Sequence, residues 1–389
     1  MTTFNTLENK PPSTRIQSVD LLRGVVMVLM AIDHVRVYSG MPAGGPEPGI
    51  FFTRWITHFC VPAFVFLAGT SAFLYGNKLN DQHKLSMFLF SRGFLLVVLE
   101  LTLIRFCWTF NLNYAQFTLA GVIWMLGWCM VLMALFVRLR PLTIGIIGLF
   151  IAFCQQIFHF VPLILPQGWR ASFGWFWEFI YPSGGDWLPG INILYVLVPW
   201  IGVMMAGYGF GTILLKQTDE RRKICLRIGL AAITIFLITA ILVICFGPAY
   251  KGNKPFLLRI LDQQKYPASQ LYLLMTLGPL IALVPFANQV KGRIADMFIT
   301  FGRAPFFYYL VHIPLIHLLA LGVNFIRKHN FHQDWYSTAP YTEIPPEHRW
   351  GLPILYLVFL IAEVILYLLC RSYARYKASH PELKLLKYI

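Results

Sequence analysis

Residues 226–248 read LRIGLAAITIFLITAILVICFGP, and Arg227 is the one charged residue in this stretch. An apolar run of this length matches the ~20 residues that an α-helix needs to cross the hydrocarbon core of a bilayer. Similar runs recur along the whole chain of 389 residues, whose mean hydropathy is +0.62. The sequence therefore predicts an all-α, polytopic integral membrane protein built as a helical bundle.

The composition excludes several classes of protein. Only 13% of the residues are charged, whereas soluble domains carry about 25%, so a soluble enzyme is excluded. A disordered chain is also excluded, because 33 Phe, 18 Tyr and 11 Trp residues require burial. Outer-membrane barrels alternate apolar and polar residues, and this chain has continuous apolar runs instead. In a membrane protein the net charge of +15 indicates first which loops lie in the cytoplasm. No nucleic-acid partner is therefore expected.

The apolar runs define ten predicted membrane spans. The connection 166–189 between the fifth and the sixth is rich in aromatic residues and is expected at the membrane interface. The predicted spans are 20–38, 51–75, 86–108, 117–137, 141–165, 190–215, 226–248, 271–288, 298–325 and 352–370.

Lysine and arginine residues indicate how these spans are oriented. With the N-terminus inside, 21 of the 32 basic residues fall on the cytoplasmic side, 10 fall outside and Arg105 falls within a span. Cytoplasmic loops of membrane proteins carry such an excess. The sequence therefore predicts both termini in the cytoplasm, with a flexible tail at 1–18, a transmembrane domain at 19–372 and a basic tail at 373–389.

One outer loop departs from this charge rule. Loop 249–270 carries four basic residues, among them Lys251 and Lys254, and Asp262 alone opposes them. A long loop can simply tolerate such charges. The alternative is a functional one, in which the loop forms a rim that binds an anion.

The cysteine and histidine patterns argue against a metal centre. Seven cysteines occur in or beside apolar runs, and none of them forms a CxxC pair. An odd number without such pairs indicates buried, inert thiols rather than a disulfide framework or a zinc site. Two histidines of the ninth span are five residues apart, which differs from the HxxxH spacing of metal-binding helices. No metal is therefore expected.

The first span carries ionisable residues at two depths. Arg23 lies near its cytoplasmic end, and Asp33, His34 and Arg36 lie in its outer third. Arg23 and His34 are eleven residues apart, so they share a helix face and are separated by about 16 Å of rise. Charges within a span cost free energy and are functional candidates. The alternatives are that Arg23 reaches to the interface and that Asp33 only pairs with Arg36.

The second and third spans add further polar candidates. His58 lies in the outer part of the second span, at a depth similar to that of His34. The third span carries Arg92 near the inside and then Glu100 and Arg105 in its outer half. Glu100 and Arg105 are five residues apart, so they are poorly placed to pair with each other and are expected to find partners on other helices.

The sixth, ninth and tenth spans complete the set. The ninth contains Arg303 near the inside, then His312 near mid-depth and His317 further out, and Glu363 of the tenth has no evident partner. The glycine-rich stretch 202–211 of the sixth span favours close helix packing.

Intramembrane His, Asp, Glu and Arg residues are also what a proton-coupled transporter needs, but the chain lacks the paired broken helices of many transporters. A serine hydrolase is disfavoured, because no GxSxG motif occurs.

Several of these segments resemble one known family. RIQSVDLLRGVVMVLMAIDHVRVYSG, HFCVPAFVFLAGTSAFL, SRGFLLVVLELTLIRFCWTFN, PWIGVMMAGYGFG, LYLLMTLGPL and FGRAPFFYYLVHIPLIHLLA are similar to bacterial relatives of heparan-α-glucosaminide N-acetyltransferase. Arg23 and His34 also fit the R-x10-H pattern of transmembrane acyltransferases. Animal members of the family have their proposed active histidine in the following outer loop, and residues 39–50 contain none. His34 and His58 are the available substitutes.

The resemblance implies an enzyme of the bacterial cytoplasmic membrane that takes an acetyl group from cytosolic acetyl-CoA. The implied acceptor is a hydroxyl or amine of an extracytoplasmic glycan or amino sugar. Besides acetyl-CoA and the acceptor, the expected partner is the lipid bilayer, and a homodimer is one assembly that the sequence allows.

The chemistry of such a transfer gives each candidate residue a role. Acyl transfer needs a base and donors that stabilise the oxyanion, and histidine suits the base. His34 is the predicted base, and Asp33 or Glu100 is the predicted orienting carboxylate. Because neighbouring residues of a helix point about 100° apart, Asp33 cannot easily bond to His34, and Glu100 is the better candidate. The predicted groups that polarise the carbonyl are His58, His312 or Arg105. Predicted contacts to CoA come from Arg23, Arg92 and Arg303, and predicted contacts to the acceptor come from Arg36, Arg105, Lys251 and Lys254.

Overall fold

A computed structural model describes residues 16–182, 190–248, 250–338, 344–380 and 382–383, with the exception of the side chains of residues 170 and 171. It is helical almost throughout, which confirms the predicted all-α membrane fold. The elements are α1 (Gln17–Tyr38), α2 (Pro48–Trp55), η1 (Ile56–Phe59), α3 (Cys60–Leu79), α4 (Gln82–Leu99), η2 (Glu100–Ile104), α5 (Arg105–Thr109), β1 (Thr118–Ala120), α6 (Val122–Phe136), α7 (Pro141–Phe153), α8 (Gln156–Ile164), α9 (Gln167–Ile180), β2 (Ile191–Ile193), α10 (Trp200–Leu214), α11 (Thr218–Phe246), α12 (Phe256–Leu261), α13 (Gln270–Ala287), α14 (Arg293–Arg303), α15 (Pro305–Lys328), η3 (Gln333–Tyr336), η4 (Pro346–His348) and α16 (Leu352–Ser379).

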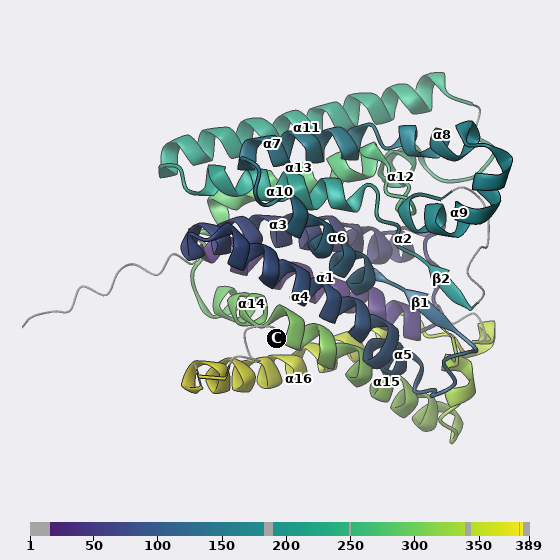
Figure 1. The fold of residues 1–389 in the computed structure, drawn as a ribbon. Coiled ribbons are helices and arrows are strands. Elements are labelled where there is room, and N and C mark those ends of the chain that lie inside the picture. The colour runs from purple at the N-terminus through teal and green to yellow at the C-terminus, as the bar shows by residue number, and fades with distance from the viewer. Residues whose placement is uncertain (1–15, 183–189, 249, 339–343, 381, 384–389) are drawn as a thin grey trace, which may run out of the picture.

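The long helices run roughly side by side, with α11 along one flank and α16 along the other (Figure 1). Helix α1 lies inside the bundle and packs against α3, α13, α14, α15 and α16. It begins at the end of the bundle where α16 ends, as an even number of spans requires (Figure 1). The two short strands β1 and β2 pair in parallel at the opposite end of the bundle. The polar residues of α1 are thus surrounded by other helices.

Six helical stretches are long and apolar enough to cross a membrane, and the bent pair α7–α8 would be a seventh. Helices α6 and α10 are apolar but shorter, and α1 has 22 residues but carries four charged ones. Each of the ten predicted spans therefore coincides with one of these helices or bent pairs. The number that crosses the bilayer, and the side on which each terminus lies, stay predictions.

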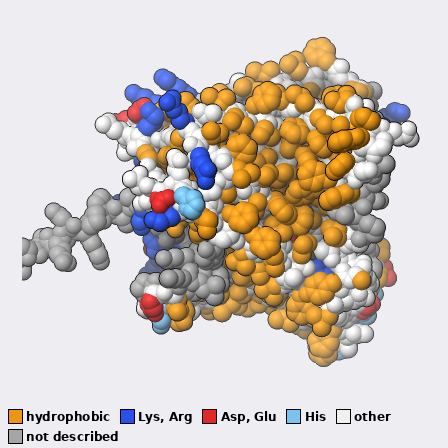
Figure 2. All heavy atoms as spheres, viewed as in Figure 1, with side chains coloured by type: hydrophobic (Ala, Val, Ile, Leu, Met, Phe, Trp, Pro, Cys, Tyr) orange, Lys and Arg blue, Asp and Glu red, His pale blue; other side chains and the backbone are white. Residues whose placement is uncertain are grey.

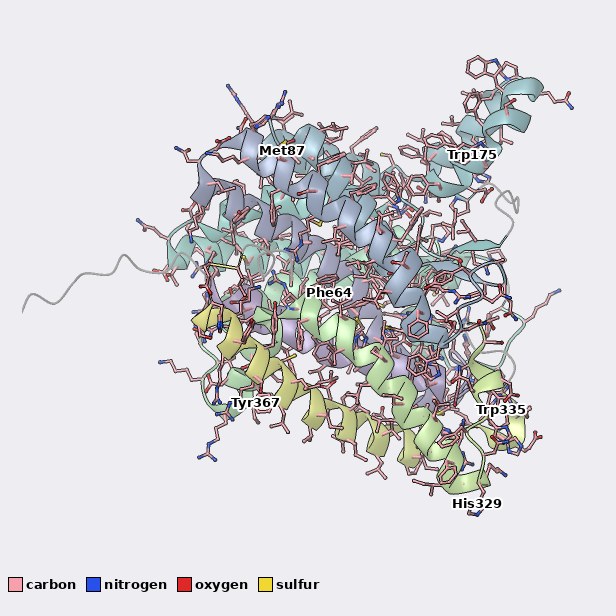
Figure 3. The ribbon with its side chains drawn as sticks, turned by 60° about the horizontal axis from the view of Figure 1, so that its bottom comes forward. Phe64, Met87, Trp175, His329, Trp335 and Tyr367 are labelled. Atoms are coloured by element: carbon pink, nitrogen blue, oxygen red, sulfur yellow. The ribbon has the colours of Figure 1, made fainter. Side chains whose placement is uncertain are left out.

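The face seen in Figure 2 agrees with this arrangement. Apolar side chains cover its middle, and Lys and Arg gather at the left end, beside the start of α1. In the turned view of Figure 3, Trp175 of α9 and Trp335 of η3 lie toward the other end of the bundle, away from Met87 of α4. An apolar band with a basic end and an aromatic end is the pattern of a membrane-spanning bundle.

Glycines set the distance between the central helices. A Cβ at Gly24 of α1 would collide with the backbone of Phe298 in α14, and a Cβ at Gly302 of α14 would collide with the backbone of Asp20. Gly207 meets the backbone of α3 in the same way, which confirms that the glycine-rich stretch serves helix packing. Small residues allow helix backbones to approach this closely inside a membrane.

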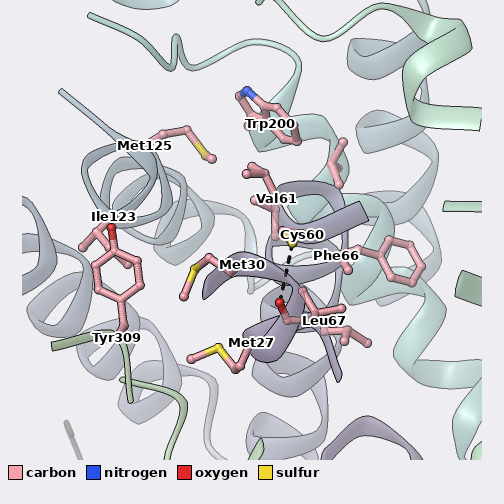
Figure 4. Packing of buried hydrophobic residues seen from close by; sticks show 14 of the residues in the cluster. Met27, Met30, Cys60, Val61, Phe66, Leu67, Ile123, Met125, Trp200 and Tyr309 are labelled. Atoms are coloured by element: carbon pink, nitrogen blue, oxygen red, sulfur yellow. Dashed lines mark hydrogen bonds between the residues drawn. The ribbon is translucent and has the colours of Figure 1, made fainter. Parts of the chain in front are cut away.

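The core around α1 is filled by sulfur-containing and aliphatic side chains. Met27 and Met30 of α1 are at most 5% exposed, and the thiol of Cys60 donates a hydrogen bond to the carbonyl of Val26 at 3.5 Å (Figure 4). Of the seven cysteines, five are buried, Cys154 is half-buried and Cys245 is exposed. The prediction that all seven cysteines are buried is therefore wrong for Cys154 and Cys245. Cys245 lies on the outward face of α11.

Several predicted segments differ from the helices at their ends or within them. The segment 141–165 is two helices that meet at 71°, and 298–325 is broken at Ala304, before Pro305. The aromatic connection after residue 166 contains α9, and its residues 183–189 lie outside the described part. Helix α16 continues to Ser379, past the predicted boundary at 372, because its sequence has no helix breaker there. Of the two predicted tails, residues 1–15 and 384–389 lie outside the described part.

Candidate functional site

Two histidines from distant parts of the sequence meet inside the bundle. Nδ1 of His34 on α1 lies 2.6 Å from Nε2 of His312 on α15, and the two rings stack with centroids 4.8 Å apart. His312 is fully buried and His34 is partly exposed. The edge of the Trp108 ring closes the other side of His34, at 4.9 Å between centroids. The structure therefore brings two predicted site residues into direct contact.

The hydrogen bonds of His312 decide which nitrogens carry protons. Its Nδ1 lies 2.7 Å from the carbonyl oxygen of Tyr309 and 3.1 Å from that of Tyr308. Carbonyl oxygens only accept, so this nitrogen carries a hydrogen. In the neutral ring Nε2 of His312 is then an acceptor, and Nδ1–H of His34 donates to it. The remaining nitrogen of His34, Nε2, keeps its lone pair and is free to act as a base.

A group of charged residues lies beside this pair. Arg36 Nε donates to Oδ1 of Asp33 at 2.9 Å, and Arg36 also donates to the carbonyl of Met41 at 2.9 Å. The ammonium of Lys265 lies 3.9 Å from Oδ2 of Asp33, and Arg54 is within electrostatic range of the same carboxylate. The i, i+3 pair of Asp33 and Arg36 is thus confirmed, but it is one part of a larger set.

His58 faces the same charged group from another helix. It lies in η1, the 3-10 turn between α2 and α3, and is 7% exposed. Its backbone carbonyl accepts a hydrogen bond from the hydroxyl of Tyr272 at 2.7 Å, while its ring Nδ1 is buried without a hydrogen-bond partner among the described residues. We call this set the outer cluster, after the side on which the charge rule places it. Its members are Asp33, His34, Arg36, Arg54, His58, Lys265 and His312.

Glu100 lies in a different place from the predicted one. It opens η2, a π-helical turn of the third span, and its carboxylate accepts hydrogen bonds from the backbone amides of Gly121, Ile123 and Trp124 at the start of α6. The positive end of a helix stabilises a carboxylate there. Neither Glu100 nor Asp33 hydrogen-bonds to His34 in the part of the chain that the structure describes, and the orienting partner of His34 is His312.

The guanidinium of Arg105 is hydrogen-bonded to the loop that follows it. Its guanidinium donates to the carbonyls of Phe117, Asn111 and Asn113 and stacks on the ring of Tyr114, with 4.5 Å between Cζ of Arg105 and the ring centroid. The expectation of a partner on another helix is wrong for Arg105, because the chain turns back after α5 and presents these carbonyls. The contacts of Arg105 are those of a residue that holds a loop in place.

Two of the three predicted CoA contacts, Arg23 and Arg303, lie next to each other toward the other end of α1. Arg23 donates to the carbonyl of Gly302 at 3.2 Å and to the hydroxyl of Ser71 at 2.5 Å, which places it next to Arg303. Arg303 is exposed at the end of α14. Arg92 of α4 lies over Phe88, at 5.8 Å from the ring centroid, and near Tyr373 of α16. We call Arg23, Arg92 and Arg303 the inner cluster.

The basic loop 249–270 divides into exposed and buried residues. Lys251 is exposed, and Lys254 forms an ion pair with Asp262. Lys265 of the same loop is 7% exposed and points into the outer cluster. Sequence reasoning missed Lys265 and Arg54 as site residues. The signal for Lys265 was present, because this loop broke the charge rule.

Among the described residues, no group of three or more His, Cys, Asp or Glu side chains is arranged to hold a metal ion. In the outer cluster three cationic side chains surround a single carboxylate, which disfavours a metal cation there. The donor set instead fits proton transfer and the binding of an anion.

The fold and these clusters define an integral membrane protein with polar residues at two depths of an apolar bundle. The family model described as "Heparan-alpha-glucosaminide N-acetyltransferase, catalytic" matches residues 15–244, which run from before α1 to the last turn of α11. This is more than half of the chain. The protein therefore belongs to this family and is a membrane acetyltransferase in the general sense. No curated protein matches the sequence. Lys265, Arg303 and His312 lie beyond the matched residues.

Proposed function

We propose that this protein transfers an acetyl group from cytosolic acetyl-CoA to a hydroxyl or amine of an extracytoplasmic sugar or glycan, in a bacterial cytoplasmic membrane. Family membership supports the reaction class. The observation that carries the mechanism is the His34–His312 pair, which leaves Nε2 of His34 unprotonated. A base of this kind is what acyl transfer from a thioester requires.

The proton moves through His34 in both halves of the reaction. Nε2 of His34 accepts the proton of the acceptor O–H or N–H while that atom attacks the thioester carbonyl. The C–S bond then breaks, and His34 returns the proton to the leaving thiolate of CoA. During the step Nε2 of His312 accepts a hydrogen bond from Nδ1–H of His34 and holds the ring, which is the part that a carboxylate plays in a Ser-His-Asp triad.

His58 is the group that we propose to polarise the carbonyl. Its buried Nδ1 has no partner in the structure. In the tautomer that carries a hydrogen on Nδ1, this atom gains a hydrogen bond when an oxyanion forms next to it. Interactions made mainly in the transition state accelerate the chemical step.

The inner cluster is the proposed entry of the acetyl donor. CoA carries phosphates, and arginine binds phosphate through paired N–H groups. Arg23 and His34 are eleven residues apart on α1, so about 16 Å of helix separates the two clusters. An extended pantetheine arm that follows α1 would bring the thioester to His34.

The base assignment is tested with His34→Ala in the purified full-length protein in detergent. We expect acetyl transfer to fall by about 10²–10⁴-fold, as measured by mass spectrometry of a panel of amino sugars and glycans, while acetyl-CoA binding by calorimetry is retained. The matched control is His317→Gln on α15, the helix of His312, because His317 contacts the carbonyl of Cys107 and the side chain of Gln333 rather than the outer cluster. Full turnover by His34→Ala would refute the assignment.

A further inference from the structure

Glu363 is the one acidic residue of α16, a helix long and apolar enough to cross a membrane. Its Oε1 accepts a hydrogen bond from the hydroxyl of Tyr308 at 2.5 Å. Its Oε2 is buried and has no hydrogen-bond partner among the described residues. An ionisable side chain in such a place costs free energy and is a functional candidate together with its partner. The role of Glu363 therefore depends on what Tyr308 does.

Tyr308 links Glu363 to the histidine pair. It is fully buried on α15, and its ring stacks on the imidazole of His312 with 5.4 Å between centroids and 26° between planes. Its backbone carbonyl is one of the two acceptors for Nδ1–H of His312, at 3.1 Å. Phe301 of α14 packs edge to face against the same ring, at 5.1 Å between centroids. Tyr308 thus contacts His312 through both its ring and its backbone, while its hydroxyl reaches α16.

The part of α15 that carries these residues lies between two interruptions. The helix is separated from α14 by Ala304, and Pro314 lies inside it. Proline has no N–H, so the carbonyl of Leu310 lacks its usual partner within the helix. A helix can bend at such a point. The hydrogen bond between Tyr308 and Glu363 ties this stretch to α16 and restricts its movement.

The orientation of the His312 ring matters because Nε2 of His312 meets Nδ1 of His34 at 2.6 Å. A hydrogen bond weakens steeply when its angle departs from linear. Rotation of the His312 ring within its own plane of stacking would turn Nε2 away from His34. The Tyr308 ring and carbonyl oppose this rotation, and Glu363 keeps the Tyr308 ring in place.

We propose that Glu363 is a positioning residue for acetyl transfer. It accepts from the hydroxyl of Tyr308, and Tyr308 in turn holds His312 in the orientation in which its Nε2 accepts from His34. This inference rests on the proposed function and extends its site to α16. Glu363 lies beyond residues 15–244, which the family model matches.

The hydrogen bond is tested by kinetics of the purified full-length protein in detergent. Glu363→Leu removes the acceptor, and Tyr308→Phe removes the donor but keeps the ring. Each should lower kcat by about 3–10-fold, the effect of one lost hydrogen bond, with little change in KM for acetyl-CoA. Glu363→Gln keeps an oxygen that can accept from Tyr308 and should retain most of the rate. The matched control is Tyr376→Phe, an exposed tyrosine of the same helix.

Double variants separate positioning from a general loss of packing. The rate is counted per acetyl-CoA site found by calorimetry, so that misfolded protein does not contribute. If Glu363 acts through Tyr308 and His312, Glu363→Leu should cause no further loss of kcat in Tyr308→Phe or in His312→Leu. A merely structural residue would lower kcat by the same factor in every background. That result, full turnover by Glu363→Leu, or a Glu363→Gln variant as slow as Glu363→Leu would overturn the proposal.

The histidine pair can also be observed without turnover. In protein labelled with ¹⁵N in its histidines, the NMR signals of the ring nitrogens report hydrogen bonding, and those of the pair are identified by their loss in His34→Ala and His312→Leu. We expect Glu363→Leu and Tyr308→Phe to shift these signals and Glu363→Gln to leave them in place. Unshifted signals in Glu363→Leu would refute the positioning role. If the signals shift although the wild type acetylates no sugar, the proposed function fails and the catalytic role of Glu363 fails with it, while its coupling to the histidine pair stands.

Discussion

Nδ1 of His34 and Nε2 of His312 lie 2.6 Å apart, although 278 positions separate the two residues in the sequence. His312 is fixed by carbonyl oxygens of its own helix, so it can only accept from His34. In the proposed mechanism a neutral imidazole thus takes the orienting role that a carboxylate has in a Ser-His-Asp triad.

His312 is expected to act by positioning His34. His312→Leu removes the acceptor for Nδ1–H of His34 and should lower kcat by about 10–100-fold, the usual effect of losing such a supporting contact, with little change in KM for acetyl-CoA. His312→Gln offers a carbonyl oxygen in its place and should restore part of the rate. Steady-state kinetics of both variants check this. An equal loss in both variants would indicate a merely structural role.

Asp33 is expected to hold the outer cluster together. Asp33→Asn leaves Arg36, Arg54 and Lys265 without their carboxylate, and breaking a buried ion pair costs about 3–5 kcal/mol. Chemical or thermal unfolding in detergent should show a marked loss of stability. The control is Asp262→Asn, whose partner Lys254 is at the surface, and exposed pairs contribute about 0–1 kcal/mol. Similar losses in both variants would contradict the prediction.

The close contact of α1 and α14 depends on Gly302. Gly302→Ala forces a methyl group into the backbone of Asp20, and overpacking of this kind costs about 1–3 kcal/mol or more. Gly322→Ala on α15 is the matched control, because a Cβ there meets nothing within 4 Å. It should be neutral or stabilise the helix by up to about 1 kcal/mol. Unfolding curves of the two variants measure the difference, and the prediction fails if Gly302→Ala is as stable as the wild type.

Arg303 is expected to contribute to the affinity for acetyl-CoA. Arg303→Gln removes a guanidinium from the inner cluster, and loss of a charged hydrogen bond should weaken binding by about tenfold or more. The affinity should also fall with rising salt concentration, because the contact is exposed. Calorimetric titration checks both effects. Arg375→Gln, an exposed arginine near the end of α16, is the control for non-specific charge, and an equal effect there would leave Arg303 without a specific role.

The predicted orientation is tested by labelling from one side. His83 lies at the start of α4 and His329 lies at the end of α15, and both are exposed. In intact cells a membrane-impermeant maleimide should label His329→Cys and spare His83→Cys, whereas both should react after the membrane is opened. The unmodified protein measures the background from its native cysteines. The reverse pattern would invert the topology.

The sequence by itself determined the class of protein and its local pairings. Apolar runs such as 226–248 have few structures open to them other than membrane helices, because a backbone in lipid must satisfy its own hydrogen bonds. The i, i+3 pair of Asp33 and Arg36 followed from helix geometry alone. The family followed from motifs that are contiguous in the sequence, so no tertiary contact was needed to read them.

Only the tertiary structure decided the partners across helices. A hydrogen bond forms within about 3 Å, so the rotation and depth of each helix settle whether two side chains meet. Those quantities depend on contacts such as Gly302 against Asp20, which no helical period encodes. For this reason Glu100 was predicted beside His34 but lies at the start of α6, and Lys265, which belongs to a loop, reaches Asp33 inside the bundle.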